Sequence, residues 1–432
     1  MRKYLSGFLV LILFFITIQI LNAATIKAGT SCTKLGQNQI IAGYKFTCIK
    51  SGKKLVWDKG VAVNKSNPTA SQIPLEPSWK ASPEPLDNCR IKDFRTTQNI
   101  GQNLHIAYPN TGSLFPSSGE LNVALIPIDF PDVPGKGKPS DFINVEIIQM
   151  NKWIKQFSND NLKLNWQFHD SWIRTTKSSE NYAALHPGFE ANPLHGAVKV
   201  NFRPAGDVAA DFLGFANQYY DYKNLSFVFF IFPKEVINIY AGMSAATQVH
   251  SPQGDLYLGT ISSGAYTYSK NLPIWSSFLH EMMHYIGLAG HAPNDGSPFG
   301  LMTGQGGLSL VLYTWEQIIL DWQLPNEIYC VSKENLQNAT IPLSAVEVDR
   351  TIGTKSIVIK LSDHEVLVIE FRKYGYWAKG WKGFNGFPKD LSGLVVYKVD
   401  TSVDINRVPD SSGFAFFEKI GNGKNGTLYQ DY

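Results

Sequence analysis

Apolar residues fall into short blocks that predict both strands and helices. Residues 121–130 and 225–232 are dense in aliphatic and aromatic side chains, which is typical of buried strands. Apolar residues recur at near-helical spacing over residues 142–157, and apolar and polar residues alternate over residues 162–168. These patterns predict a helix followed by a strand.

After Cys330 the pattern becomes rich in strands. Apolar, β-branched runs occupy residues 356–361, 366–371 and 394–399, and no helical periodicity separates them. We therefore expect residues 331–432 to form an all-β domain.

The first 23 residues predict an export signal. A short positive start, Met1 to Lys3, precedes an apolar run from Leu9 to Leu21, and small residues follow it. We expect cleavage after Ala23. The alternative is an uncleaved anchor, but the run is shorter than the roughly 20 residues that span a bilayer. The chain is therefore expected to be secreted, with no stable membrane anchor after cleavage.

Two short segments follow the signal. Residues 28–57 alternate around Tyr44, Phe46 and Cys48 between turn residues, which predicts a small hairpin module held by a disulfide. Cell-surface attachment and a passive N-terminal cap are both open as its role. Residues 58–88 are rich in proline and poor in apolar periodicity, so they are expected to be a linker.

The chain has four cysteines, Cys32, Cys48, Cys89 and Cys330. An even number in an exported protein favours disulfides, and three pairings are open. We expect Cys32 to pair with Cys48 in a local loop, and Cys89 with Cys330. The alternative is a free Cys89 thiolate that masks a metal ion and leaves Cys330 unpaired.

Composition and charge exclude one broad class of partner. With 39 basic and 36 acidic residues, the net charge is only +3, and no dense basic cluster stands out from the whole chain. The sequence therefore offers no electrostatic case for binding nucleic acid.

The strongest chemical signal is a His-Glu-x-x-His motif at residues 280–284. Pro273 marks a helix start and Gly287 suits a helix end in the left-handed conformation. His280 and His284 are four residues apart, so they project from one helix face and can share a zinc ion. Glu281 is then the general base that activates the attacking water.

Zinc needs a third protein ligand, and His291 is our prediction. A chain reversal at Gly287 would return His291 to the metal. In the metzincin pattern, however, the ligand falls three residues after that glycine, where this chain has Gly290. Asp295, Glu316 and water are the alternatives.

A glycine-rich turn at residues 300–304 contains Met302 and looks like the Met-turn below the metal of metzincins. The next predicted helix, residues 314–322, carries Trp315 and Trp322, which we expect in the core. Tyr313 is a candidate oxyanion donor. The remaining candidates near the site, for which solvated or core positions are favoured, are His169, His186, His195 and His250.

These segments together resemble the immune inhibitor A family of secreted bacterial metallopeptidases. The likeness covers about residues 115–400 and includes residues 123–132, residues 158–164 and the zinc motif with Gly287-Leu288. It continues through Leu301-Met302, residues 315–322, 369–372 and 392–396. It implies hydrolysis of peptide bonds in proteins outside the cell. This chain departs from the family at Ala289 and Gly290, which puts the third ligand in question.

The expected fold class is α+β. A metzincin-like zinc peptidase domain, residues 89–330, with a mixed sheet and an active-site helix, precedes a sandwich-like β domain. The expected cofactor is one catalytic Zn²⁺. Asp129 and Asp132 allow a Ca²⁺ site or ordinary hydrogen bonding. Expected partners are protein or peptide substrates, and cell-wall association is open.

Two other function classes compete with a zinc endopeptidase. One is a degenerate, non-catalytic cell-surface binding protein, motivated by Gly290. The other is a metal-dependent hydrolase of a different bond, such as an amide in peptidoglycan.

Overall fold

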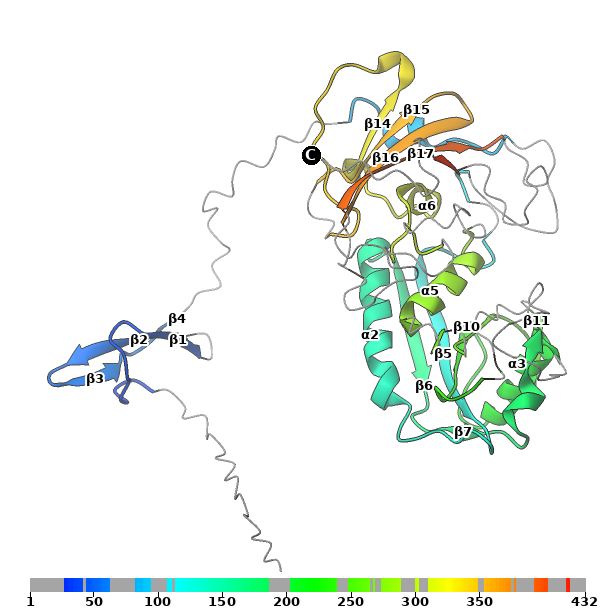
Figure 1. The fold of residues 1–432 in the computed structure, drawn as a ribbon, viewed down its shortest axis with the longest axis horizontal. Helices are drawn as coiled ribbons and strands as arrows, with labels where there is room; N and C mark the ends of the chain where they lie inside the picture. The colour runs from blue at the N-terminus through cyan, green and yellow to red at the C-terminus, as the bar shows by residue number, and fades with distance from the viewer. Residues whose placement is uncertain are drawn as a thin grey trace, which may run out of the picture. The chain divides into compact units, whose positions relative to one another are not determined.

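The computed structural model describes residues 27–41, 44–62, 82–94, 107–110, 113–185, 203–237, 239, 248–264, 267–268, 273–288, 300–302, 310–348, 353–373, 377, 392–402 and 417–419 (Figure 1). The chain divides into two compact units, Met1–Glu76 and Pro77–Tyr432. The division lies inside the predicted linker. The predicted signal peptide, residues 1–23, lies outside the described residues. No helix in the described ranges is both long enough and apolar enough to cross a bilayer.

The first unit contains the predicted cysteine-paired module. Strand β2 pairs antiparallel with β1, β3 and β4, and a disulfide joins Cys32 to Cys48. The prediction of a disulfide-stapled hairpin is therefore confirmed, and two further strands extend it. The strands are β1 (Asn38–Ile41), β2 (Tyr44–Ser51), β3 (Lys54–Trp57) and β4 (Val61–Ala62).

The second unit contains a sheet in the order β13-β10-β5-β6, and β7 continues alongside β5. All of its described pairings are parallel, whereas we expected a mixed sheet. Helical crossovers allow this arrangement, because α2 connects β5 to its parallel neighbour β6. The strands are β5 (Gly119–Asp129), β6 (Leu162–Phe168), β7 (Ile173–Arg174), β10 (Leu225–Ile231) and β13 (Gly259–Ser262).

Both faces of this sheet are buried. Val123 and Leu125 belong to one hydrophobic core with side chains of α2 and α5, whereas Ala124 and Ile126 belong to a second core with α3. Alternate side chains of one strand point to opposite faces, so helices cover the sheet on both sides (Figure 1). The helices are α2 (Ser140–Phe157), α3 (Ala205–Ala216) and α5 (Ile274–Tyr285).

Short elements complete this part of the chain. Strands β8 and β9 form a parallel pair, and β11 and β12 form a hairpin. Their bounds are η1 (Ser179–Tyr182), β8 (Ala184–Leu185), β9 (Arg203–Pro204), β11 (Gln248–Ser251) and β12 (Gly254–Tyr257).

The C-terminal strands form a second sheet in the order β14-β15-β16-β17-β18. It is one sheet in the described residues, where we expected a sandwich-like arrangement. Strand β14 crosses the predicted boundary at residues 330/331 and pairs parallel with β15. The bounds are α6 (Thr314–Ile319), η3 (Pro325–Glu327), β14 (Ile328–Ser332), η4 (Lys333–Asn335), β15 (Ser356–Lys360), β16 (Glu365–Lys373), β17 (Ser392–Asp400) and β18 (Phe417–Lys419).

The two sheets share a hydrophobic core. Phe278 and Leu279 of α5, Trp315 of α6 and Val368 of β16 all belong to the same buried cluster. The same core includes Trp322, so the predicted burial of both tryptophans is confirmed. The division into domains at residue 330 stays a prediction, but the segments on either side of it pack together.

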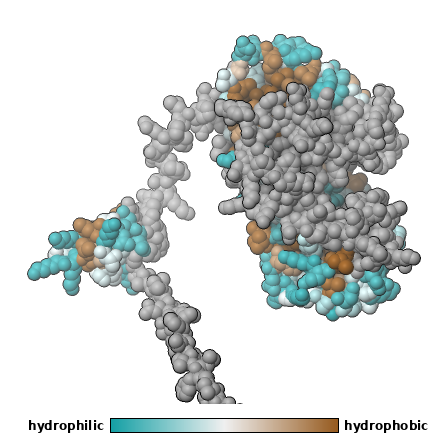
Figure 2. Space-filling model, viewed as in Figure 1, coloured by the Kyte–Doolittle hydropathy of each residue, from teal (hydrophilic) through white to brown (hydrophobic). Residues whose placement is uncertain are grey.

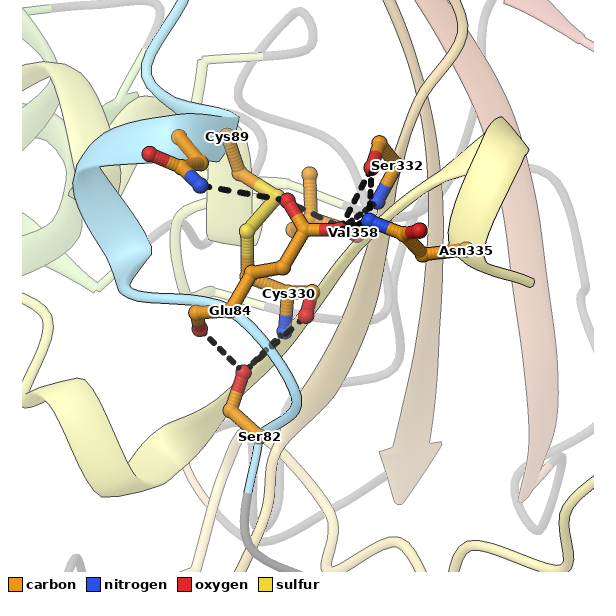
Figure 3. Close-up of a disulfide and its surroundings, with 8 residues drawn as sticks. Ser82, Glu84, Cys89, Cys330, Ser332, Asn335 and Val358 are labelled. Carbon is orange, nitrogen blue, oxygen red and sulfur yellow. Dashed lines mark hydrogen bonds between the residues drawn. A yellow bond between two sulfur atoms is a disulfide. The ribbon is translucent and has the colours of Figure 1, made fainter. Parts of the chain in front are cut away.

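A second disulfide, Cys89–Cys330, joins helix α1 (Leu86–Cys89) to β14 (Figure 3). It excludes the alternative of a free Cys89 thiolate masking a metal ion. Beside it, the Glu84 carboxylate accepts hydrogen bonds from the Ser332 backbone N–H (2.8 Å) and from Asn335 (2.9 Å). The segment around α1 is therefore fixed to the C-terminal sheet.

Candidate metal centre

Helix α5 carries the His-Glu-x-x-His motif. Apart from His284, every residue of Ile274–Tyr285 is buried. The helix packs against the parallel sheet, with the Phe278 ring 4.8 Å from that of Phe229. An amphipathic surface helix buries only one face, whereas α5 is buried on nearly all sides. Its side chains share a core with the parallel sheet and with the C-terminal sheet.

A side chain from another helix accepts a hydrogen bond from the first turn of α5. Pro273 occupies the N-cap position, as expected, but has no side chain that can accept a hydrogen bond. Glu146 of α2 does this instead, because its Oε2 accepts the Trp275 N–H at 2.9 Å. Burial raises the pKa of Glu146 despite the nearby backbone donors of Trp275 and Ile274. A carboxyl from α2 therefore anchors the first turn of the motif helix.

The end of α5 follows the expected glycine pattern. Gly287 has φ of 107°, and the Leu288 N–H bonds to Met283 O (2.9 Å) while the Gly287 N–H bonds to His284 O (3.3 Å). This pair of bonds is a Schellman motif. A Cβ at Gly287 would lie 2.1 Å from Asn110 Nδ2, so both the φ value and the space require glycine.

The last carbonyls of the helix bind the segment that leads into β5. Tyr285 O accepts the backbone N–H groups of Leu114 (2.8 Å) and Phe115 (3.2 Å), and Asn110 Nδ2 donates to Ile286 O (3.2 Å). Both ends of α5 are thus held by other parts of the unit.

His280 and His284 lie on the same face of α5, one turn apart. Their ring centroids are 4.9 Å apart and the ring planes are nearly perpendicular, at 88°. His280 is fully buried, whereas His284 is partly exposed. The pair therefore extends from the buried interior toward solvent.

Backbone carbonyls determine which nitrogen of each ring carries the proton. His280 Nδ1 lies 2.8 Å from Leu301 O, and His284 Nδ1 lies 3.4 Å from Leu288 O. A carbonyl only accepts hydrogen bonds, so Nδ1 is the protonated nitrogen in the neutral ring and Nε2 carries the lone pair. Histidines that bind a metal commonly donate the other ring N–H to a backbone carbonyl in this way, so the arrangement fits zinc.

Glu281 follows His280 and is almost fully buried, with 6% of its surface exposed. A buried carboxylate next to a pair of imidazoles is suited to accept and return a proton. The role of Glu281 as general base stays a prediction.

The methionine-containing turn lies directly beside the first histidine. Leu301, whose carbonyl binds His280, precedes the fully buried Met302, and the Leu301 N–H binds Val311 O at 2.8 Å. The predicted proximity of this turn to the zinc motif is therefore observed in the described part, Gly300–Met302. Thr303 and Gly304 lie outside the described residues.

The third ligand is the open part of the centre. His291 and Asp295 lie outside the described residues, so the preference between them stays a prediction. Glu316 instead caps α6, where its Oε2 accepts the Tyr313 N–H at 2.7 Å, and burial raises its pKa to about 8. Within the described ranges, no group of three or more His, Cys, Asp or Glu side chains is arranged to hold a metal ion.

The residues around α6 form a buried ionic cluster. Glu370 Oε2 accepts the Thr314 N–H (2.8 Å), and Glu370 Oε1 accepts Arg372 Nε (2.7 Å). The Arg372 guanidinium lies 5.0 Å from the Tyr313 ring centroid and 3.6 Å from a Glu347 oxygen. Glu370 and Arg372 therefore make structural contacts. Tyr313 packs inside this cluster, which accounts for its burial without a role as oxyanion donor.

The carboxylates considered for calcium have protein partners. Arg174 contacts both oxygens of Asp129 (2.8 and 2.6 Å), and Asp132 accepts the Ser179 N–H (2.8 Å) and hydroxyl (2.7 Å). Hydrogen bonding explains both residues, and a guanidinium next to Asp129 disfavours a cation there.

The other histidines have local contacts or lie outside the described residues. The His169 ring stacks on Tyr219, with centroids 4.1 Å apart, and the exposed His250 lies 2.6 Å from an Asp255 oxygen. His186 and His195 fall outside the described ranges.

Sequence reasoning missed three groups that position the centre: the Glu146 carboxyl, the Leu301 carbonyl and the Asn110 amide. Glu146 is 129 positions from Trp275 in the chain and Asn110 is 176 positions from Ile286. A single acidic residue in a helix and a single asparagine in a loop are common, so neither gives a sequence signal.

Comparison of the chain with models of protein families found no match, and a search among curated proteins found no significant relative. The resemblance across residues 115–400 therefore remains an expectation, and the case for a function depends on the geometry of α5.

Proposed function

We propose that this chain is a secreted, metzincin-like zinc endopeptidase that cleaves peptide bonds in extracellular proteins. The observation that carries the proposal is the orientation of the two rings. His280 and His284 lie one turn apart, and each places Nδ1 toward a backbone carbonyl. In this tautomer each Nε2 carries a lone pair, so the two rings would supply two of the three protein ligands of a catalytic zinc ion.

The roles of the residues follow from this arrangement. His280 and His284 would hold the metal, with His291 as the proposed third ligand. Zinc, when bound, supplies a Lewis acid and makes water acidic enough to lose a proton near neutral pH. Glu281 would accept a proton from the attacking water and would return it to the departing amine. The Leu301 and Leu288 carbonyls keep the imidazoles in the required tautomer.

Secretion is supported by two observations. The first 23 residues have the pattern of an export signal, and the chain has two disulfides and no free cysteine among its four. Disulfides persist mainly in oxidising environments outside the cytosol.

The proposal is tested by combining zinc analysis with cleavage of casein. We expect about one zinc per chain in the wild type and in Glu281→Gln, because Glu281 is not assigned as a ligand. Cleavage by Glu281→Gln should fall at least a hundredfold, in line with loss of a general base. His280→Ala and His284→Ala should lose both zinc and activity.

Three outcomes would contradict the proposal. Full activity of Glu281→Gln would remove the assigned base. Zinc bound at His280 and His284 without cleavage of casein or any other protein would favour a non-catalytic binding protein. Release of amino groups from peptidoglycan fragments, but not from casein, would assign a different bond.

A further inference from the structure

The charge of the chain is concentrated in the N-terminal module. Residues 27–62 contain seven lysines and one acidic residue, Asp58, a net charge of +6, whereas the whole chain carries +3. The rest of the protein is therefore slightly acidic. This excess is hidden in the overall composition and becomes visible when the module is counted by itself.

The lysines of the module face solvent. Within the described residues, six of them are exposed and form no ion pair: Lys27, Lys34, Lys50, Lys53, Lys54 and Lys59. The single acid does not offset them locally. Asp58 Oδ1 accepts the backbone N–H groups of Thr47 and Gly60, both at 3.0 Å, and these bonds lower its pKa.

Three of the six lysines cluster at one turn. Lys53 lies in the two-residue connection between β2 and β3, in which Gly52 has φ of 60°. Lys50 and Lys54 lie on the strands beside it and, from the register, project from opposite faces of the hairpin. Figure 2 shows hydrophilic residues at this end of the module. Lys59 follows the opposite end of β3, and Gly29, close to Lys27, binds Trp57 O there. Three residue steps along β3 separate the two ends by about 10 Å.

The scaffold that carries these charges is rigid. The Cys32–Cys48 disulfide, the buried Trp57 and the Phe46 ring packed against Gly60 fix the sheet. The charges are therefore presented at defined positions and not on a loose tail. A single small anion would reach only one end, but a polymer with charges every few ångströms would contact both.

We propose that residues 27–62 bind an anionic, phosphate-rich polymer of the cell wall. The choice among polyanions rests on the aromatic side chains and the predicted export. Trp57 is buried and Phe46 is half-buried against Gly60, which disfavours the base stacking by which single-stranded nucleic acid is bound. The described module has no amphipathic helix of the kind that lies in a membrane surface. Export places the module where wall polymers are found.

The test uses the full mature chain with Glu281→Gln, so that binding is measured independently of any peptidase activity. The probes are purified bacterial cell walls with their phosphodiester polymers, the same walls after chemical removal of these polymers, duplex DNA, and vesicles containing phosphatidylserine. We expect binding to the phosphate-bearing walls alone, with an affinity that falls steeply and linearly in a log–log plot against salt, because bound counterions are released.

Two charge-reversal variants, each with three substitutions, locate the binding surface. Lys50→Glu/Lys53→Glu/Lys54→Glu should weaken binding about a hundredfold and flatten the salt dependence. The matched control, Lys163→Glu/Lys177→Glu/Lys223→Glu, changes the net charge equally at exposed positions of the second unit and should change affinity less than about threefold.

Several results would overturn the proposal. Equal binding to stripped walls would exclude the phosphate polymer, and equal losses in the two triple variants would exclude the module as the binding surface. Binding of DNA or vesicles in preference to walls would assign a different partner. Far-UV circular dichroism and an intact Cys32–Cys48 disulfide show whether the Lys50/Lys53/Lys54 variant is folded. If it is not, the comparison of intact and stripped walls, made with all lysines present, still tests the proposal.

Discussion

At the residue scale, the centre depends on backbone atoms that no side-chain motif reveals. The Leu301 carbonyl orients His280 and the Leu288 carbonyl orients His284, so the chain on either side of the undescribed residues 289–299 determines the tautomers. The end of helix α5 fixes the position of the Leu288 carbonyl, and the methionine-containing turn fixes that of Leu301. Changes in the helix end should therefore affect metal binding as well as stability.

Gly287→Ala tests this connection. The new Cβ would meet Asn110 and the φ of 107° would strain any other residue, so we expect destabilisation by at least about 1–3 kcal/mol. Zinc affinity should fall with it, because Leu288 moves. Urea unfolding and competition with a chelator measure the two effects.

The matched control is Gly214→Ala, in the exposed part of α3, where a Cβ meets nothing within 4 Å. It should stabilise the protein by up to about 1 kcal/mol. An equal response of the two variants would show that Gly287 has no special role.

At the element scale, α5 is secured at both ends by distant parts of the chain. The local features of the motif helix could be predicted, because spacing of four residues and a closing glycine are properties of a single segment. The groups that secure it could not, because they depend on tertiary structure. The same holds for α3, whose alanines and glycines give a weak periodic pattern, and for the extra strand β14 of the C-terminal sheet.

Glu146 should contribute to α5 through its hydrogen bond. Glu146→Ala removes the acceptor of a buried N–H and should cost about 1–3 kcal/mol in the free energy of unfolding. Glu146→Gln keeps an oxygen in place and should retain most of the stability. Chemical denaturation of both variants makes the comparison, and an equally large loss in Glu146→Gln would contradict capping by an oxygen acceptor.

The contact of Glu84 with Ser332 and Asn335, beside β14, should stabilise the protein in a pH-dependent way. Hydrogen bonds from Ser332 and Asn335 lower the pKa of Glu84 to about 2. Since the folded-state value is below that of the unfolded chain, the contribution is present above about pH 4.5 and is lost as the pH falls toward 2. Glu84→Gln should therefore be less stable than wild type at pH 7.

Urea midpoints at pH 7, 4.5 and 3 check this prediction. The difference between Glu84→Gln and wild type should shrink steadily as the pH is lowered. A difference in midpoint that does not change with pH would mean that the charge of Glu84 does not contribute to stability.

At the scale of the whole molecule, the chain forms two units, and each contains one disulfide. The composition predicted the export signal, the linker and the pairing of the cysteines, and both disulfides are confirmed. The close packing of the C-terminal sheet against α5 and α6 could not be predicted from segment patterns, because it depends on long-range contacts such as that between Thr314 and Glu370.

The two disulfides should act on different units. The Cys89–Cys330 bond closes a long loop of sequence separation 241, so the Cys89→Ala/Cys330→Ala variant should lose about 2–5 kcal/mol in the unfolding of the second unit. Cys32→Ala/Cys48→Ala should leave that transition unchanged, because it affects the first unit. Calorimetry distinguishes them, and a shift of the same transition by both variants would contradict independent units.

The most direct test of the central claim is an anomalous-scattering map collected at the zinc edge from crystals of the mature protein. We expect one strong peak within about 2.0–2.1 Å of Nε2 of both His280 and His284, beside Glu281. A map with no peak there, or with zinc bound elsewhere in the chain, would contradict the assignment of α5 as a metal centre.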